Sequence, residues 1–299
     1  MQLKDKESFI EYYNAARNPY THKGDYGRVF IIAGSEGMTG AAMLCAESAV
    51  RAGAGLVYLF APGKILPVYE IGCKEAVKIK IGDDKTSFFE ESHVYQVVKT
   101  IKRAGDSVCV VVGPGLGTNI QTKKFVHGVL AEFSSSNIPV ILDADGLNSY
   151  KNKLYKERKL PKKLIITPHT GELSRLTGLS TDYINNNRVE AAKKASEELG
   201  AIVVLKGNES LVCSENPSRE IYINTTGNAG MATGGSGDVL AGILAGLTAA
   251  DGGKSTYFEI ACCGVFIHGL CGDMASAKYG QRAVKAGDLI EMLKEVVLL

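Results

Sequence analysis

A glycine-rich stretch carries the strongest chemical signal in this sequence. Residues 224–250 read NTTGNAGMATGGSGDVLAGILAGLTAA, and six glycines fall between Gly227 and Gly242. Glycines this close together weaken a strand but suit a loop whose N–H groups approach a ligand. The apolar run after Asp238 predicts a buried helix. A helix that opens at such a loop attracts anions, because its unpaired N–H groups and its dipole point at the same place.

Asp238 stands out inside this stretch, because a carboxylate at a phosphate-binding turn would repel the phosphate. It therefore needs another task, and the natural one is to accept the proton of a hydroxyl group that attacks phosphorus. The alternative is structural, since Asp238 could simply cap the helix that follows it. The surrounding glycines favour the chemical interpretation.

The elements that must position this loop are strands and helices in alternation. The strand-like runs are apolar throughout, which is typical of strands buried on both faces of a parallel sheet. We therefore predict an α/β fold, a three-layer α/β/α sandwich with a mainly parallel central sheet. The expected strands cover 29–33, 56–60, 108–112, 140–142, 164–167 and 201–205, with antiparallel strands around 210–212 and 220–223, and the expected helices cover 40–53, 88–103, 119–133, 183–199, 237–250, 255–278 and 287–297.

Composition places few other constraints on the protein. The chain has 299 residues, of which 45% are hydrophobic and 22% charged, and no linker or repeat divides it. We expect residues 1–299 to form a single domain, with a polar helix over 5–16, inside the first 20 residues, packed on the outside. The net charge of +2 has no basic stripe, so we expect neither nucleic acid nor a membrane as partner.

No segment approaches the roughly 18 apolar residues that a membrane span needs, and no export signal opens the chain. The cysteines number seven and lie mostly in apolar surroundings, which favours reduced core thiols in a cytoplasmic protein. Neither a CxxC pair nor an HExxH motif occurs, so a structural or hydrolytic zinc site has no support.

Two expected strands end in side chains that could bind a ligand, and ligands bind beyond the carboxyl ends of parallel strands. Asp143 and Asp145 lie at i and i+2, so in an extended segment they share a side and could hold Mg²⁺ or a hydroxyl group. Asp145 could equally cap a helix. His169 follows the next strand and is expected at the ligand edge, with Thr170 capping the helix that starts near Glu172.

Two other strand ends carry glycine. Gly115 lies in the turn GPGLG, which permits close approach of a ligand but could also be a plain tight turn. Lys206 and Gly207 end another strand. Lys206 could contact phosphate, and the backbone after it could lie along an adenine, whereas a surface lysine in a hairpin is the alternative.

Two nucleotide-binding patterns are rejected. The stretch GSEGMTG after the first strand has the spacing GxxGxxG, and the next strand does not end in the acidic residue that a dinucleotide site uses for ribose. Gly253-Lys254-Ser255 lacks the glycine that a P-loop needs five residues earlier, where Thr248 stands.

Taken together and in this order, the motifs resemble the ADP/ATP-dependent NAD(P)H-hydrate dehydratases, a branch of the ribokinase-like superfamily. The resemblance runs from HKGDYG at residue 22 to near residue 290 and rests on HKGDYGRV, IIAGS, GAA, RAGAGLV, GPGLG, ILDADGLN, ITPHTGEL, VVLKG and NAGMATGGSGDVLAG. The GxGD element is shared with other ribokinase-like enzymes, whereas ITPHTGEL and HKGDYG are much more specific to the dehydratases.

The resemblance implies an enzyme that restores NADH or NADPH from a 6-hydroxy hydrate at the expense of a nucleotide. Asp238 would take the proton of the hydrate hydroxyl as it attacks the terminal phosphoryl group, and the N–H groups of Gly235, Ser236 and Gly237 would stabilise the charge that develops. The phosphorylated hydrate would then expel phosphate. Mg²⁺ would bridge the nucleotide phosphates, and ADP is the expected donor, with AMP as its product.

The resemblance also implies the binding residues. Ala41, Gly115 and His169 would contact the hydrate together with Asp238, and Gly237 would lie beside the nucleotide phosphate. A further segment would line the nucleotide, namely Lys206, Gly207, Asn208, Glu209 and Ser210. Ser210 replaces the threonine that the family often has, which keeps a small hydroxyl group.

Family members form tetramers, so a homo-oligomer is expected. Only about 20 residues precede HKGDYG, so the epimerase activity that many relatives carry is expected on another chain or in a part of the protein that this sequence does not include. Two alternatives remain open: a small-alcohol kinase of the same fold, similar to hydroxyethylthiazole kinase, and a non-catalytic nucleotide-binding protein on this scaffold.

Overall fold

One sheet runs through the protein, whose computed structural model describes residues 5–105, 107–151, 156, 159–216 and 218–296. In this part of the chain nine strands follow the order β3-β2-β1-β4-β5-β6-β7-β8-β9, parallel as far as β7 and antiparallel for the last two. The predicted mainly parallel sheet with an antiparallel end is therefore confirmed. The strands are β1 (Arg28–Ile32), β2 (Leu56–Pro62), β3 (Val77–Ile81), β4 (Val108–Val112), β5 (Val140–Leu142), β6 (Leu164–Ile166), β7 (Ile202–Leu205), β8 (Leu211–Cys213) and β9 (Ile221–Ile223).

Successive residues of each strand pack on opposite faces of the sheet. In β4, Cys109 and Val111 belong to the core on one face, whereas Val108, Val110 and Val112 belong to the core on the other. Side chains alternate along a strand, so a strand covered on both faces needs an apolar residue at every position. This is why the strands could be recognised as uninterrupted apolar runs.

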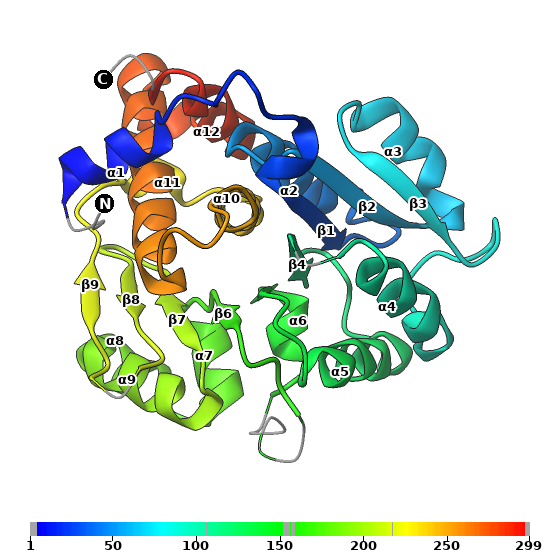
Figure 1. Cartoon of the computed structure of the whole chain (residues 1–299). Helices are drawn as coiled ribbons and strands as arrows, with labels where there is room; N and C mark the ends of the chain where they lie inside the picture. The colour runs from blue at the N-terminus through cyan, green and yellow to red at the C-terminus, as the bar shows by residue number, and fades with distance from the viewer. Residues whose placement is uncertain (1–4, 106, 152–155, 157–158, 217, 297–299) are drawn as a thin grey trace.

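Helices cover both faces, which confirms the predicted three layers (Figure 1). One core cluster joins the sheet to α2, α10, α11 and α12, and the other joins it to α4, α5, α7, α8 and α9. The helices are α1 (Lys6–Tyr13), α2 (Thr39–Arg51), α3 (Leu66–Gly72), α4 (Val94–Lys102), α5 (Ile120–Phe133), α6 (Asp145–Asn148), α7 (Thr170–Thr177), α8 (Thr181–Asn186), α9 (Arg188–Leu199), α10 (Ser236–Ala250), α11 (Tyr257–Tyr279) and α12 (Ala286–Leu293).

Two of the predicted helices divide or start differently in the structure. The helix expected over 183–199 is two helices, because Asn187 adopts a non-helical conformation (φ −135°, ψ 50°) between α8 and α9. The helix expected from residue 88 starts as α4 only at Val94, since Phe89 is buried against Phe125 and Glu90 is extended. Helix α3 and strand β3 were not predicted.

The amino-terminal helix α1 is shorter than the predicted range 5–16, because it ends at Tyr13. It lies at the outside of the fold, as expected, but it also contributes to the core. Phe9 is 1% exposed and packs edge-on against Tyr222 and close to Phe266. The hydroxyl of Tyr12 donates a hydrogen bond to Asp251. Residues 1–4 lie outside the described part.

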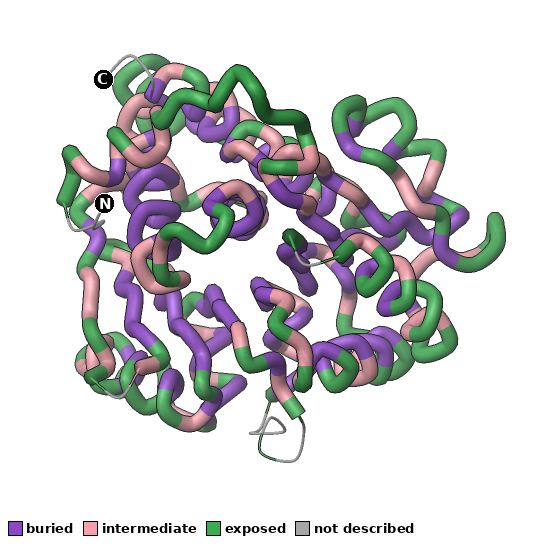
Figure 2. Tube along the Cα trace, viewed as in Figure 1, coloured by how far each residue is buried: buried purple, intermediate pink, exposed green. Residues whose placement is uncertain are grey.

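Helix α11 differs from one expectation drawn from the sequence. By length and composition alone it could cross a membrane, although no such segment was expected. Its apolar window is 72% buried inside the fold, against α10, α12 and α1. Figure 2 shows α10 and α11 as largely buried helices. A helix that passes through a core needs apolar residues all round, which produces the same composition.

Candidate active site

The five strand-end motifs meet at one edge of the sheet. Strands β1, β4, β5, β6 and β7 are parallel neighbours, so their carboxyl ends lie side by side, where open α/β sheets bind ligands. The amino end of α10 reaches the same edge. A methyl group on the Cα of Gly237 would lie 3.2 Å from Lys206 Nζ and 3.8 Å from Asp143 Oδ2. The glycine-rich loop therefore faces the ends of β5 and β7.

The first turn of α10 presents free N–H groups to this edge. Gly235 precedes the helix in a left-handed conformation (φ 91°), which favours glycine, and no side chain caps the helix. In the described part of the chain, nothing accepts a hydrogen bond from the N–H of Gly235, Gly237 or Asp238. The N–H of Ser236 is engaged by the carbonyl of Thr233 at 3.4 Å. The turn can therefore bind an anion, with less help from Ser236 than from its neighbours.

Asp238 has the character of a general base. It lies in the first turn of α10 without capping it, so the purely structural alternative has no support. Burial and, after it, the charge of Asp143 raise the pKa of its carboxyl from the usual 3.8 to about 6, against the opposing effect of Lys206. A carboxylate with a pKa close to neutrality is ionised at pH 7 and still basic enough to take a proton.

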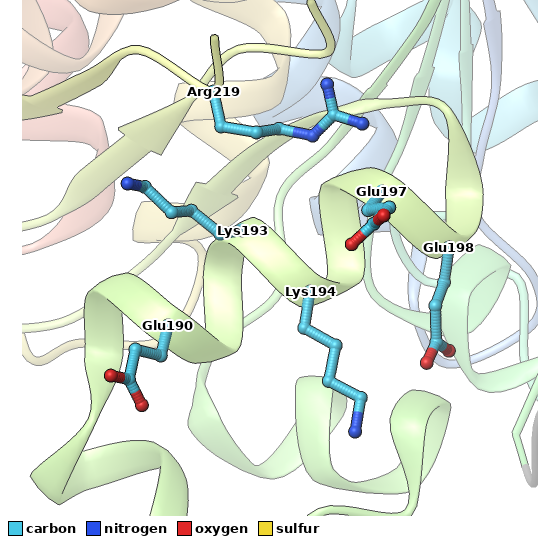
Figure 3. A pocket seen from close by; sticks show the side chains of 6 residues that line it. All are labelled: Glu190, Lys193, Lys194, Glu197, Glu198 and Arg219. Atoms are coloured by element: carbon cyan, nitrogen blue, oxygen red, sulfur yellow. The ribbon is translucent and has the colours of Figure 1, made fainter. Parts of the chain in front are cut away.

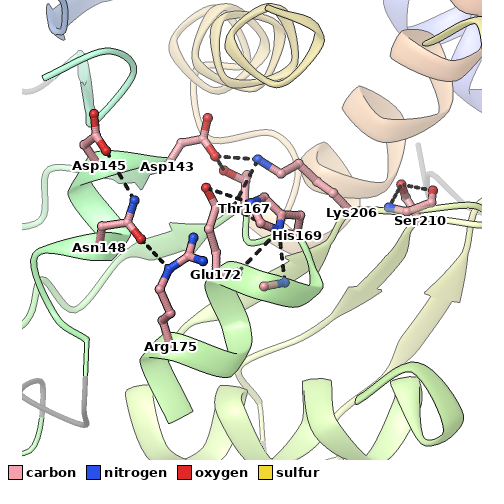
Figure 4. Close-up of polar contacts among 11 residues, drawn as sticks. Asp143, Asp145, Asn148, Thr167, His169, Glu172, Arg175, Lys206 and Ser210 are labelled. Carbon is pink, nitrogen blue, oxygen red and sulfur yellow. Dashed lines mark hydrogen bonds and ion pairs between the residues drawn. The ribbon is translucent and has the colours of Figure 1, made fainter. Parts of the chain in front are cut away.

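Lys206 is held by carboxylates rather than extended into solvent. Its Nζ donates a hydrogen bond of 2.8 Å to Asp143 Oδ1 and lies 3.6 Å from Glu172 Oε2 (Figure 4). Burial alone would lower the pKa of this ammonium, but Asp143 and Glu172 raise it above its usual value, so the group stays charged. The alternative of a surface lysine in a hairpin is wrong.

The rest of the predicted nucleotide segment forms the turn between β7 and β8. Ser210 Oγ accepts a hydrogen bond from the N–H of Gly207 at 3.3 Å and donates one to its carbonyl at 3.1 Å. Glu209 adopts a left-handed conformation (φ 54°). Asn208 and Glu209 are exposed, whereas the Lys206 side chain points back to Asp143. The structure therefore separates the ammonium of Lys206 from the turn 207–210.

His169 is a helix cap and a candidate ligand at once. Its Nδ1 accepts hydrogen bonds from the N–H groups of Gly171 and Glu172, so the proton of the neutral ring is on Nε2, and about half of the side chain is exposed. The prediction that Thr170 caps α7 is wrong, because Thr170 is the first residue of the helix and its hydroxyl bonds to Asn185.

Ala41 and Gly115 lie together, as two residues of one binding surface should. A methyl group on Gly115 would lie 3.0 Å from Ala41 Cβ and 2.9 Å from the carbonyl of Met38. Ser35 fixes the turn, since its hydroxyl donates a hydrogen bond of 2.9 Å to the Gly115 carbonyl. Gly115 has φ 61°, so a side chain there would be both strained and crowded.

The two carboxylates after β5 take separate tasks. Asp143 and Asp145 were expected to share a side of an extended segment. This is wrong, because Ala144 between them has φ 48° and ψ −117°. Asp143 bonds to Lys206 and to Thr167 Oγ1. Asp145 is the first residue of α6 and accepts hydrogen bonds from the N–H of Gly117 and the amide of Asn148. Among the described residues, no group of three or more His, Cys, Asp or Glu side chains could hold a metal ion.

Residues of α11 hold the glycine-rich loop and were not predicted. Nε2 of His268 donates a hydrogen bond of 3.0 Å to the carbonyl of Ser236, and burial lowers the pKa of this imidazole to about 4, so it stays neutral. Asp273 accepts hydrogen bonds from the N–H of Gly227 and the amide of Asn228. The available signal was the occurrence of these polar residues inside an otherwise apolar helix.

A surface pocket lies elsewhere on the molecule, along the outside of α9. Figure 3 shows the three acidic and three basic side chains that line it, which are Glu190, Lys193, Lys194, Glu197, Glu198 and Arg219. Balanced, solvated charges of this kind are typical of an exposed helix face. None of the predicted site residues contributes to it.

Comparison with known proteins decides between the members of this fold class. A sequence model of the NAD(P)H-hydrate dehydratase family matches residues 29–295. This chain belongs to that family. It is 36% identical over 278 residues to the ADP-dependent (S)-NAD(P)H-hydrate dehydratase of Neisseria meningitidis, covering 92% of this chain and 86% of that protein.

Structural similarity supports the same family. The crystal structure of the ADP/ATP-dependent NAD(P)H-hydrate dehydratase of Bacillus subtilis, co-crystallised with ATP and Mg²⁺, superimposes with a TM-score of 0.76 at 28% identity, covering 96% of this chain and 95% of that one. The ribokinase-like α/β/α fold is thereby confirmed.

Many curated relatives are longer. The bifunctional NAD(P)H-hydrate repair enzyme of Thermofilum pendens is 36% identical over 284 residues, which cover 94% of this chain but 52% of that protein. The chain thus spans about half the length of the bifunctional relatives it matches. The expectation that the epimerase activity resides on a separate chain therefore remains a prediction.

Proposed function

We propose that this protein is a nucleotide-dependent NAD(P)H-hydrate dehydratase, which returns the 6-hydroxy hydrates of NADH and NADPH to the reduced cofactors. The observation that carries the proposal is the meeting of Asp238 with the anion-binding turn of α10. Asp238 has a pKa of about 6 and lies beside the free N–H groups of that turn and close to the Lys206 ammonium. A base and an anion site this close together suit phosphoryl transfer to a hydroxyl group.

The first step is phosphorylation of the hydrate. Asp238 accepts the proton of the hydroxyl group on C6, and the oxygen attacks the terminal phosphorus of the nucleotide. The bond between that phosphorus and the bridging oxygen breaks, so that ADP leaves as AMP. The N–H groups of Gly235 and Gly237 hold the transferring phosphoryl group, and Ser236 contributes less because its N–H is already engaged by Thr233.

The second step is elimination of phosphate. The lone pair of the ring nitrogen helps to break the bond between C6 and oxygen, and phosphate departs with the oxygen of the former hydroxyl group. Loss of a proton from C5 restores the double bond of the dihydronicotinamide. Ala41 and Gly115, which lie against each other, would contact the hydrate together with His169, whose Nε2–H is a donor for a polar group of the substrate.

The donor is proposed to be ADP as its Mg²⁺ complex. Mg²⁺ would enter with the nucleotide and would neutralise part of the charge on its phosphates. The turn 207–210 after Lys206 contacts the adenine nucleotide. A single domain, a cytoplasmic location and a homotetramer remain predictions.

Recovery of the reduced cofactor tests the proposal. The protein is incubated with NADH hydrate, Mg²⁺ and either ADP or ATP, and the absorbance of the dihydronicotinamide is followed at its long-wavelength band. We expect absorbance to rise only when a nucleotide is present. A stable phosphate ester without recovered absorbance would instead indicate a small-alcohol kinase, and nucleotide binding without turnover would indicate a non-catalytic protein.

A further inference from the structure

The buried carboxylate of Asp143 holds the ammonium of Lys206 in place. Asp143 and Thr167 follow β5 and β6, and each is 1% exposed. Asp143 Oδ1 accepts hydrogen bonds from Thr167 Oγ1 at 2.7 Å and from Lys206 Nζ at 2.8 Å (Figure 4). The hydroxyl of Thr167 thus orients the carboxylate, and the carboxylate orients the ammonium.

This ion pair lies directly against the anion-binding turn. The Cα of Gly237 faces both partners, because a methyl group placed on it would be 3.2 Å from Lys206 Nζ and 3.8 Å from Asp143 Oδ2. The free N–H groups of Gly237 and Asp238 belong to the same turn. A cation and unpaired N–H groups therefore converge on one place, where a phosphoryl group can be bound by both.

A lysine without this support would not stay there. Its four-carbon side chain has many rotamers, and the site already contains the carboxylates of Glu172 and Asp238, which compete for the ammonium. Asp143 is the closest carboxylate to Nζ, and it is nearly inaccessible to solvent, so it does not move with the surface. The fixed position of Lys206 follows from this contact.

We infer that Asp143, supported by Thr167, is a positioning residue that holds the Lys206 ammonium against the first turn of α10, where the ammonium binds the terminal phosphoryl group of the nucleotide. The inference rests on the proposed function, since it assigns a task within that site. Asp143 acts through Lys206, and its negative charge also acts on the base Asp238.

The first test measures binding of ADP with Mg²⁺ by calorimetry to the whole chain, with adenosine as a probe that lacks phosphate. Asp143→Asn keeps the size of the side chain and an acceptor oxygen, and Lys206→Met removes the ammonium. We expect each variant to weaken ADP binding by about tenfold or more and adenosine binding by less than about twofold. In the Lys206→Met background, Asp143→Asn should cause no further loss.

Matched variants keep this test decisive. Glu197→Gln on the outer face of α9 should bind both probes as the wild type does. Thr167→Val removes only the supporting hydroxyl, and it should cause a smaller loss that is still specific to ADP. Equal losses for ADP and adenosine, or losses that multiply in the double variant, would overturn the inference. If Asp143→Asn does not fold, unchanged ADP binding by Thr167→Val would overturn it equally.

The second test is the pH dependence of turnover. The charged groups that face Asp238 are Asp143 after β5, Asp145 from α6, Glu172 from α7 and Lys206 after β7. On the other side, the imidazole of His268 and the thiol of Cys45 are neutral near pH 7, since burial lowers the pKa of the first and raises that of the second.

Asp143→Asn removes a negative charge that raises the pKa of Asp238, and the released ammonium moves toward Glu172 and Asp238, the carboxylates that compete for it. The acid limb of the pH profile of kcat should therefore move to lower pH in Asp143→Asn, by about half a pH unit or more. A merely structural role would lower kcat without moving this limb, so an unmoved limb contradicts the inference. The ADP-binding test needs no hydrate, so it decides the role of Asp143 even if the protein fails to turn over NADH hydrate.

Discussion

Replacing Asp238 by asparagine should abolish turnover and at the same time stabilise the protein. Asparagine has nearly the same size but cannot take the proton of the hydrate hydroxyl, and loss of a general base costs at least about 10²–10⁴ in rate. The gain in stability has a different origin. Asp238 is ionised in a site that disfavours its charge, because burial and Asp143 raise its pKa from 3.8 to about 6.

The size of the gain follows from this shift. A difference of about two pKa units between the folded and the unfolded chain corresponds to about 3 kcal/mol, at about 1.4 kcal/mol per unit. This is the free energy by which ionised Asp238 destabilises the folded state near pH 7. The neutral amide of asparagine resembles the protonated carboxyl, so the variant avoids most of this cost.

The gain should depend on pH in a definite direction. Below about pH 4 the carboxyl is protonated in both folded and unfolded chains, so wild type and variant should be equally stable. As the pH rises from about 4 to about 6, the unfolded chain releases the proton first, and the wild type loses stability relative to the variant. Above about pH 6 the difference should be constant at its full value.

Urea unfolding of both proteins between about pH 4.5 and 8 measures this difference, and turnover of NADH hydrate is measured on the same preparations. A variant as stable as the wild type, or less stable, at about pH 7.5 would refute the reasoning about burial and charge. A variant that turns over the hydrate at the rate of the wild type would refute the assignment of Asp238 as the base.

Three further substitutions or substrates test other parts of the site. Gly237→Val should reduce kcat/KM at least about tenfold, because its side chain would reach the Lys206 ammonium. Urea unfolding should show that the free energy of unfolding falls by no more than about 1–2 kcal/mol. Normal ADP affinity and a normal rate would place the anion site elsewhere. His169→Ala should raise KM for the hydrate more than KM for the nucleotide and cost about 1 kcal/mol of stability through the lost cap; steady-state kinetics that show equal effects would make His169 structural. ADP with Mg²⁺ should support dehydration with AMP as product. The additional phosphate of ATP would move its transferable group several ångströms away from the anion-binding turn of α10. Much faster use of ATP, with ADP accumulating, would contradict ADP as the donor.

Much of the fold could be predicted because its signals are local. Strands buried on both faces are apolar at every position, and helix α10 follows its glycine loop directly in the sequence. Strand β3 escaped prediction because it lies at the sheet edge and carries two lysines among its five residues, which breaks the apolar run. The break between α8 and α9 falls at Asn187, the last of three consecutive asparagines, which are weak helix formers, so this signal was missed.

The sequence predicted that the candidate site residues lie at one edge of the sheet, but not the contacts between them. The strand-end positions of His169 and Lys206 follow from parallel topology, since the ends of β6 and β7 must be neighbours. The pairing of Lys206 with Asp143 could not be predicted, because 63 residues separate them and the direction of a side chain depends on packing. The turn at Ala144, which separates the two carboxylates, is a conformation unusual for alanine and has no signal in the sequence.

The motif HKGDYG shows the opposite case, a segment specific to the family that lies away from the site. It precedes β1, at the amino ends of the strands, where a side chain on Gly27 would collide with the carbonyl of Ala249. Gly27 thus permits close packing against the end of α10. A motif can therefore identify a family without contributing to its chemistry.

The fate of the hydroxyl oxygen tests the central claim most directly. NADH hydrate labelled with ¹⁸O at the C6 hydroxyl group is incubated with the protein, ADP and Mg²⁺, and the phosphate is analysed by ³¹P NMR or mass spectrometry. Because the hydroxyl oxygen attacks phosphorus before its bond to C6 breaks, the label should appear in inorganic phosphate, in step with the restored dihydronicotinamide. Label found in water, or retained in a stable organic phosphate ester, would contradict phosphorylation followed by elimination.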